Sequence, residues 1–219
     1  MFIACSYDFK TTFLWNNKTN QLYLLAMNRI QEIELSQKIY RKGYCIRDQE
    51  AIYFLTFQIV GWIDIFTRSK YKDIIVDSLN YCCSNKQLKV HAWVIMSNHV
   101  HCIISSTNGK LSDTIRDLKR HTSKTILNAI LNENESRKDW MINQFKYFAS
   151  RHKRNELYQF WTHENHPIEL QGSLIKQRLN YVHNNPVRAN IVAKPEDYLY
   201  SSALDYSGEK GFVPIEFLY

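Results

Sequence analysis

The feature that most constrains the fold of this chain is an apolar run from Val90 to Ile104, which is interrupted near Ser97-Asn98. β-Branched and aromatic residues on both sides of a short polar break are typical of two neighbouring strands. We therefore expect strands over residues 88–95 and 99–105 that are joined at this break.

Two histidines, His99 and His101, stand at the start of the second of these strands. Side chains at i and i+2 of a strand share a face and lie roughly 6.5–7 Å apart along the backbone. Two imidazoles so placed can bind one divalent cation, whereas a strand that binds nothing favours valine at such positions. The pair indicates a metal site. The alternative is equally open for these residues alone, because strand histidines are usually hydrogen-bonded core or surface residues.

The order of the elements predicts an α+β fold. Apolar residues spaced by three or four indicate helices, and β-branched or aromatic runs indicate strands. The order β-α-β-β-α-β-α predicts an antiparallel sheet with helices packed mainly on one face, in a ferredoxin-like or split β-α-β arrangement. Besides the two strands above, the expected elements are a strand over residues 52–60, helices over residues 70–83 and 111–131, a polar segment with isolated aromatic anchors over residues 133–156, a strand over residues 158–162, and a last helix that Ser173 caps and Asn184-Asn185-Pro186 ends.

The length of 219 residues suits one domain with an appendage. We expect residues 1–47 to be an N-terminal appendage, partly helical over residues 24–40, and residues 48–219 to be the main domain with a C-terminal extension. No apolar stretch approaches the roughly 18–20 residues of a membrane span. The five cysteines include no Cys-x-x-Cys spacing, which suits a reducing compartment. These observations predict a cytoplasmic protein that does not contact a membrane.

The net charge of +7 favours a polyanionic partner, with nucleic acid as the simplest choice and an acidic membrane surface as the lesser one. Basic residues gather in the helix over residues 111–131 and in the polar segment that follows it. Contacts from such residues to phosphates position DNA without reading its sequence. The alternative is that these runs are solvated faces, and for Trp161 and Tyr147, which could stack on bases, core packing is favoured. The residues predicted to bind DNA are Lys119, Arg120, Lys124, Arg151, Lys153 and Arg154.

A second informative segment runs from Asn180 to Arg188, with the sequence Asn-Tyr-Val-His-Asn-Asn-Pro-Val-Arg. Tyr181 and Asn185 are four residues apart and therefore share one face of a helix. A tyrosine with a neutral oxygen ligand one turn later could complete a two-histidine metal site. A phenol is a weak nucleophile at neutral pH and needs a base, a nearby cation or a polarised substrate. Taken alone, Tyr181 fits a core or surface role better, and we expect His183 to lie at the surface or behind the site rather than to bind metal.

The two segments together resemble the single-tyrosine HUH transposases, and among these the REP-associated tyrosine transposases most. The resemblance spans about residues 48–206, and residues 1–44 have no clear counterpart in it. Ser97 and Cys102 depart from the Pro and Leu that are common in relatives, but neither position is a ligand. The matching segments are Asn98-His99-Val100-His101, the Ala92-Trp93-Val94-Ile95-Met96 before it, Phe160-Trp161 with His166-Pro167, and Tyr181 to Arg188.

The resemblance implies metal-dependent cleavage and rejoining of single-stranded DNA through a 5′-phosphotyrosine intermediate, as a transposase. It assigns Tyr181 as the nucleophile and His99, His101 and Asn185 as ligands of Mg²⁺ or Mn²⁺. The expected partner is single-stranded or hairpin DNA, bound by a monomer or a homodimer. The first alternative is a domesticated DNA-binding regulator of repeat elements without transposition activity. A phosphohydrolase of the histidine-triad type is disfavoured because Ile103 stands where that class needs its third histidine.

Overall fold

The computed structural model describes residues 45–151 and 157–218 of the chain. The helix expected over residues 24–40 lies outside these residues, and the boundary of the appendage at residue 47 stays a prediction. None of the helices in the described part is both long enough and apolar enough to cross a membrane.

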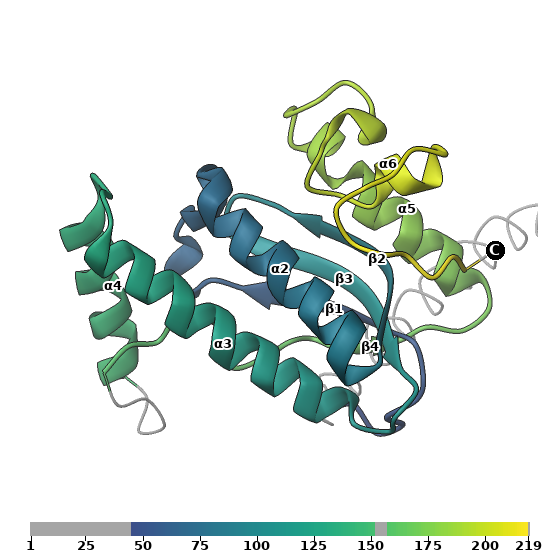
Figure 1. Cartoon of the computed structure of the whole chain (residues 1–219), viewed down its shortest axis with the longest axis horizontal. Coiled ribbons are helices and arrows are strands. Elements are labelled where there is room, and N and C mark those ends of the chain that lie inside the picture. The colour runs from purple at the N-terminus through teal and green to yellow at the C-terminus, as the bar shows by residue number, and fades with distance from the viewer. Residues whose placement is uncertain (1–44, 152–156, 219) are drawn as a thin grey trace, which may run out of the picture. The chain divides into compact units, whose positions relative to one another are not determined.

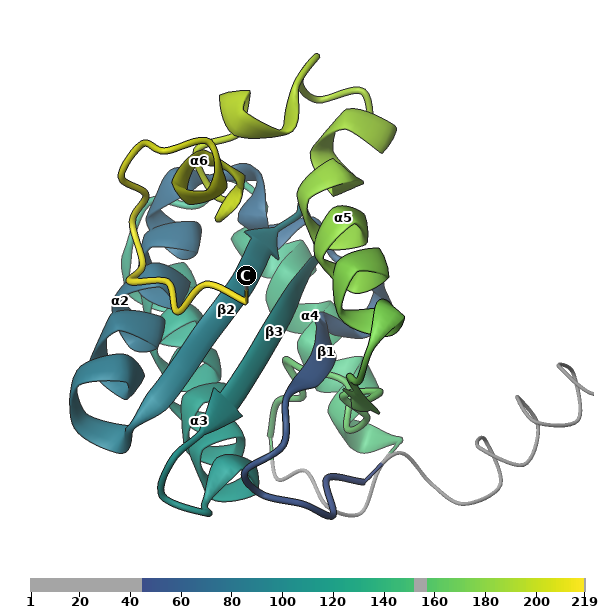
Figure 2. The same cartoon turned by 90° about the vertical axis from the view of Figure 1, so that its right-hand side faces the viewer.

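The centre of the fold is one antiparallel sheet with the strand order β2-β3-β1-β4 (Figure 2). Its strands are β1 (Tyr53–Gln58), β2 (Leu88–Ile95), β3 (His99–Ser106) and β4 (Ile168–Glu169). β3 is an inner strand that pairs with β2 on one side and with β1 on the other. The first three strands begin and end within two residues of their predicted bounds, and the predicted α+β sheet is confirmed.

The described residues form the α-helices α2 (Ser69–Lys86), α3 (Leu111–Asn132), α4 (Lys138–Ser150), α5 (Ser173–Arg188) and α6 (Ala203–Tyr206), and the 3-10 helices η1 (Val60–Trp62), η2 (Ile65–Thr67) and η3 (Pro195–Asp197). α2 and α3 match the predicted helices to within three residues. In α3 the buried side chains of Ile115, Leu118, Thr122 and Ile126 recur at intervals of three or four, as an amphipathic helix requires. Periodicity therefore predicted α2 and α3.

Helices lie over both faces of the sheet, with α2, α3 and α4 on one face and α5 on the other (Figures 1 and 2). Successive residues of a strand point to opposite faces. Val100 and Cys102 therefore join the core under α2 and α3, whereas Ile103 joins the core under α5. His99 and His101 share the face of Ile103, so the sheet presents both imidazoles to α5.

The segment predicted to be polar with isolated aromatic anchors contains the helix α4, which the sequence analysis did not predict. Its buried residues Met141, Ile142, Phe145 and Ala149 form a narrow apolar stripe at helical spacing. The many polar residues of the outer face hid this stripe.

The strand predicted over residues 158–162 is also wrong. Within it, Trp161 makes a single bridge to Ile59, and the fourth strand of the sheet is β4, which follows later in the chain. Phe160 and Trp161 are buried. The apolar run therefore predicted burial correctly, but these side chains fill the core without a ladder of backbone hydrogen bonds.

Both ends of α5 differ from the prediction. Gly172, not Ser173, precedes the helix at the cap position, and no side chain caps it by a hydrogen bond. The helix also continues through Pro186 to Arg188. Proline disfavours helix before it, but here Pro186 is buried and Asn185 Nδ2 donates to the Tyr181 carbonyl at 2.8 Å, which holds this turn.

Candidate active site

The two histidines of β3 are oriented by hydrogen bonds from their Nδ1 atoms. His99 Nδ1 lies 2.8 Å from Asn98 Oδ1, and His101 Nδ1 lies 2.9 Å from Thr56 Oγ1. Asn98 uses its Nδ2 to donate to the Trp62 carbonyl and to Asp64 Oδ1, so its Oδ1 accepts from His99. This arrangement places the proton of His99 on Nδ1 and leaves Nε2 as the nitrogen with a free lone pair. The ring centroids of the two histidines are 4.6 Å apart.

Both histidines are held neutral. Burial lowers the pKa of His99, and burial together with the neighbouring His99 and Arg178 lowers the pKa of His101 to about 3. A divalent cation binds only the unprotonated imidazole. The lowered pKa values therefore favour cation binding at neutral pH.

Tyr181 of α5 reaches this pair from across the chain. Its hydroxyl lies within hydrogen-bond distance of His101 Nε2, at 3.4 Å, and the two rings lie 5.2 Å apart at an interplanar angle of 64°. Phe54 of β1 stacks on His101 at 5.2 Å and contacts the Tyr181 ring edge-on at 5.9 Å. Leu179 and Val182 are buried in the core under α5. They fix the helix so that Tyr181 faces the histidines.

Asn185 lies one turn after Tyr181 on α5. Its Nδ2 donates to the Tyr181 carbonyl at 2.8 Å, so its Oδ1 is the atom left to accept a hydrogen bond or to coordinate a cation. Residues 45–151 and 157–218 contain no cluster of three or more His, Cys, Asp or Glu side chains that could hold a metal ion. Among the described residues, a neutral oxygen such as Asn185 Oδ1 is the candidate for a third ligand. Two imidazole nitrogens and one amide oxygen form a donor set that fits Mg²⁺ or Mn²⁺.

Two arginines that the sequence analysis did not single out lie beside Tyr181. The guanidinium carbon of Arg178 is 5.0 Å from the centre of the Phe54 ring and 5.8 Å from that of Tyr181. The guanidinium carbon of Arg188 is 5.5 Å from the centre of the Tyr181 ring. The Nε atom of Arg178 is buried and has no hydrogen-bond partner in the described part of the chain. Their helical spacing from Tyr181, three residues before it and seven after it, is the signal that could have found them.

His183 is a structural residue of α5, not a ligand of the histidine site. It is buried, its Nε2 lies 2.9 Å from Ser202 Oγ, and its ring packs on Tyr206. Burial lowers its pKa to about 4. It therefore joins α5 to the C-terminal segment, rather than lying at the surface or behind the site as the sequence suggested.

Lys119 is part of the fold and is not an open cationic side chain. Its Nζ donates to the Thr162 carbonyl at 2.8 Å and to Asn165 Oδ1 at 2.5 Å. Burial lowers its pKa to about 8. Trp161 is likewise unavailable for base stacking, because it is buried and its Nε1 donates to Thr122 Oγ1.

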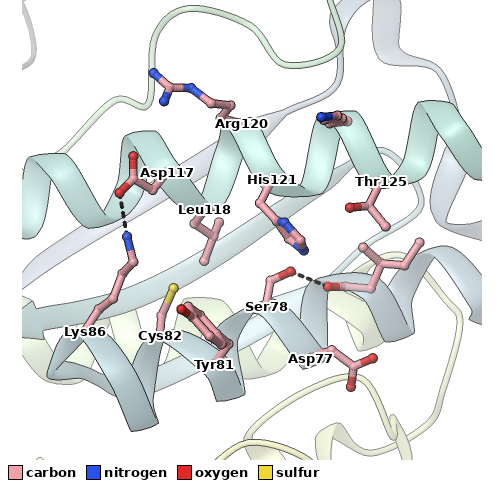
Figure 3. A pocket seen from close by; sticks show the side chains of 12 residues that line it. Asp77, Ser78, Tyr81, Cys82, Lys86, Asp117, Leu118, Arg120, His121 and Thr125 are labelled. Carbon is pink, nitrogen blue, oxygen red and sulfur yellow. Dashed lines mark hydrogen bonds and ion pairs between the residues drawn. The ribbon is translucent and has the colours of Figure 1, made fainter.

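Arg120 and Lys124 are exposed on α3, on the face of the sheet away from the histidines. With His121 they line a pocket of about 690 Å³ between α2 and α3, which also contains the Lys86–Asp117 ion pair (Figure 3). The fold therefore does not place these basic side chains beside Tyr181, and their contact with DNA stays a prediction.

The second basic cluster is described only at Arg151. This residue is exposed at the end of α4, where its guanidinium lies over the ring of Tyr147, which is also exposed. Lys153 and Arg154 lie outside the described residues. Their contact with DNA also stays a prediction.

Comparisons with known proteins support the resemblance to transposases. Residues 63–160 match the family model described as "Transposase IS200 like"; this range includes both histidines and ends before Tyr181. The fold is similar to the structure of a REP-associated tyrosine transposase bound to a REP hairpin, with a TM-score of 0.54 and 14% identity over 81% of this chain and 93% of that chain. A candidate transposase from Deinococcus radiodurans R1 matches with a TM-score of only 0.36 and 16% identity, over 64% of this chain and 92% of that chain.

No curated protein matches the chain. The chain is nevertheless similar to single-tyrosine transposases in sequence, across residues 63–160, and in fold. The resemblance drawn from the motifs is confirmed at this level.

Proposed function

We propose that this protein cleaves and rejoins single-stranded DNA by a metal-dependent transesterification in which Tyr181 is the nucleophile. The observation that carries the proposal is the 3.4 Å contact between the Tyr181 hydroxyl and His101 Nε2. It brings a nucleophile and a nitrogen ligand together from segments that are distant in the sequence. The similarity to transposases supports the same reaction class.

The covalent step conserves the number of phosphodiester bonds. The Tyr181 oxygen attacks phosphorus, the bond from phosphorus to the 3′-oxygen breaks, and the 3′-oxygen leaves with a proton. The products are a 5′-phosphotyrosine link and a free 3′-hydroxyl, which can attack the link and reverse the reaction. The phosphotyrosine link replaces the cleaved phosphodiester bond and is not hydrolysed, so rejoining the strand requires no nucleotide cofactor.

The residues around Tyr181 prepare the hydroxyl for this step. A Mg²⁺ or Mn²⁺ ion held by His99, His101 and Asn185 would orient the scissile phosphate and neutralise the charge that develops on it. His101 Nε2 cannot contact both the Tyr181 hydroxyl and a cation, so a bound cation would free the hydroxyl for attack. Arg178 and Arg188 lie beside the tyrosine ring, where their charges attract an approaching phosphate.

We also propose that Tyr181 acts with the histidines of its own chain. The buried contacts of Leu179 and Val182 hold α5 on the same sheet that carries the histidines, so a monomer contains the whole site. Mixing a Tyr181→Phe variant with a His101→Ala variant should then restore no cleavage. Restored cleavage would require a tyrosine supplied by a second chain.

The proposed substrate is single-stranded or hairpin DNA, and a cytoplasmic location fits that role. The test uses one oligonucleotide, a REP-type hairpin with single-stranded flanks, labelled in turn at its 3′ and 5′ ends. The 3′ label should become protein-bound in Mg²⁺ or Mn²⁺, and the 5′ label should appear in a shorter free strand. No adduct in either metal would reject the nuclease proposal, and tight binding without cleavage would favour a DNA-binding regulator.

A further inference from the structure

An exposed tryptophan with an unusual backbone conformation stands at the end of β1. The Trp62 side chain is 67% exposed, and its φ angle of +57° follows a φ of +61° at Gly61. A bulky residue rarely adopts the left-handed region, and such residues persist where the surrounding structure holds them for a function. Exposure of an aromatic residue alone is ordinary, so the argument depends on what holds this turn.

Contacts with α4 hold the turn that contains Gly61 and Trp62. A Cβ atom at Gly61 would lie 2.4 Å from the Phe148 ring, so only glycine allows α4 to pack here. Arg137 Nη2 donates to the Asp64 carbonyl at 3.0 Å and ties the start of α4 to the end of the turn. The helix that the sequence analysis missed therefore supports the backbone on both sides of Trp62.

The same turn is joined to the histidine site by one side chain. Asn98 Nδ2 donates to the Trp62 carbonyl at 3.3 Å and to Asp64 Oδ1 at 3.2 Å, while Asn98 Oδ1 accepts from His99 Nδ1 at 2.8 Å. Gln58, at the end of β1, pairs with His99 in the sheet. Trp62 is therefore fixed relative to the first histidine, at the end of the sheet where His99 lies.

We propose that Trp62 is a stacking platform for an unpaired nucleobase next to the scissile phosphate, an inference that rests on the proposed function. Its indole is largely exposed, so its face is open to a ligand. A base has a flat π-face that an exposed indole can cover whatever the base is. Because the turn is already rigid, little conformational entropy is lost when the strand binds. The hydrogen bonds of Asn98 fix the distance between the stacked base and the histidine site.

Trp140 provides a matched control. It is also exposed, at 49%, but it lies within the regular helix α4 and has no link to the histidines. We would compare Trp62→Ala, Trp62→Leu, Trp62→Phe and Trp140→Ala. The leucine variant keeps apolar bulk without a π-face, and the phenylalanine variant keeps a smaller ring.

The experiment measures the binding of a fluorescein-labelled 20-nucleotide single strand of mixed sequence by anisotropy, in EDTA so that no cleavage occurs. Trp62→Ala and Trp62→Leu should raise Kd about tenfold, Trp62→Phe less than about threefold, and Trp140→Ala less than about twofold. The strand should also quench the tryptophan emission of the parent protein, and Trp62→Phe should remove most of that quenching.

Other outcomes would reject the proposal for Trp62. Equal Kd values for all variants would show that Trp62 does not stack on a base. If Trp62→Ala weakened binding to the same strand in duplex form as much as binding to the single strand, stacking on an unpaired base would also be rejected. A change in solution mass with unchanged DNA binding would assign Trp62 to contact between protein chains instead. If single-strand binding depends on Trp62 but no tyrosine-linked cleavage is found, only the proposed function is rejected. If cleavage is found but binding does not depend on Trp62, only the stacking role of Trp62 is rejected.

Discussion

The Tyr181 hydroxyl lies 3.4 Å from His101 Nε2, although 80 residues separate the two in the sequence. The contact follows from two packing facts. Strand alternation turns His101 to the face that α5 covers, and the buried side chain of Val182 sets the rotation of α5 on that face. The proposed nucleophile and a proposed cation ligand therefore lie next to each other, and the predictions below test these roles.

Removal of His101 should weaken cation binding at this site. We expect His101→Ala to weaken Mn²⁺ binding, measured by titration calorimetry, by at least about tenfold, because one of three ligands is lost. Thr56→Val, which removes the Nδ1 partner of His101, should cause a smaller loss of the same sign. His183→Gln is the control, since His183 is buried away from the site. Unchanged Mn²⁺ affinity in His101→Ala would contradict the ligand assignment.

Arg178 should contribute to the chemical step rather than to folding. Its guanidinium lies over the rings of Phe54 and Tyr181, so it can contact a phosphate that approaches the Tyr181 hydroxyl. Arg178→Met keeps most of the side-chain bulk and should lower the single-turnover rate about 10- to 100-fold at saturating oligonucleotide. Arg120→Met, on α3 at the opposite face of the sheet, should leave that rate nearly unchanged. Equal rates for the two variants would remove Arg178 from the mechanism.

Gly61 should be needed for the packing of α4. Gly61→Ala combines a strained φ with a Cβ placed 2.4 Å from Phe148, and we expect it to lower the free energy of unfolding by about 2–4 kcal/mol. Gly109→Ala is a matched control: it has a similar φ of +63°, but its nearest atom is 3.8 Å away. It should cost only about 1–2 kcal/mol. Urea denaturation of both variants checks this, and equal losses would show that the clash is relieved.

Stability should fall in mild acid because of buried neutral histidines. Burial lowers the pKa of His183 to about 4, so between pH 6.5 and 4 the unfolded chain binds more protons than the folded one. The free energy of unfolding should therefore fall as the pH drops through this range, by up to about 1.4 kcal/mol per pH unit for this residue. His183→Gln should make the pH dependence of the free energy of unfolding shallower, because about one proton fewer is taken up on unfolding. An unchanged slope would show that His183 titrates alike in both states.

The sequence predicted the parts of the site that depend on local pattern. Period-two alternation placed His99 and His101 on one strand face, and helical spacing placed Tyr181 and Asn185 on one helix face. Sequence could not predict what depends on distant segments. Phe54, which packs on both His101 and Tyr181, comes from β1, and Lys119 looks like a DNA contact until Thr162 and Asn165 bind its ammonium.

The most direct test is to locate the covalent bond between protein and DNA. The protein is incubated with Mg²⁺ and the 3′-labelled oligonucleotide, digested with protease and nuclease, and analysed by mass spectrometry, with Tyr181→Phe in parallel. We predict a nucleotide mass on the peptide that contains Tyr181, and no adduct from the phenylalanine variant, which should still bind the strand. Cleavage that survives Tyr181→Phe, or an adduct on another residue, would contradict the central claim.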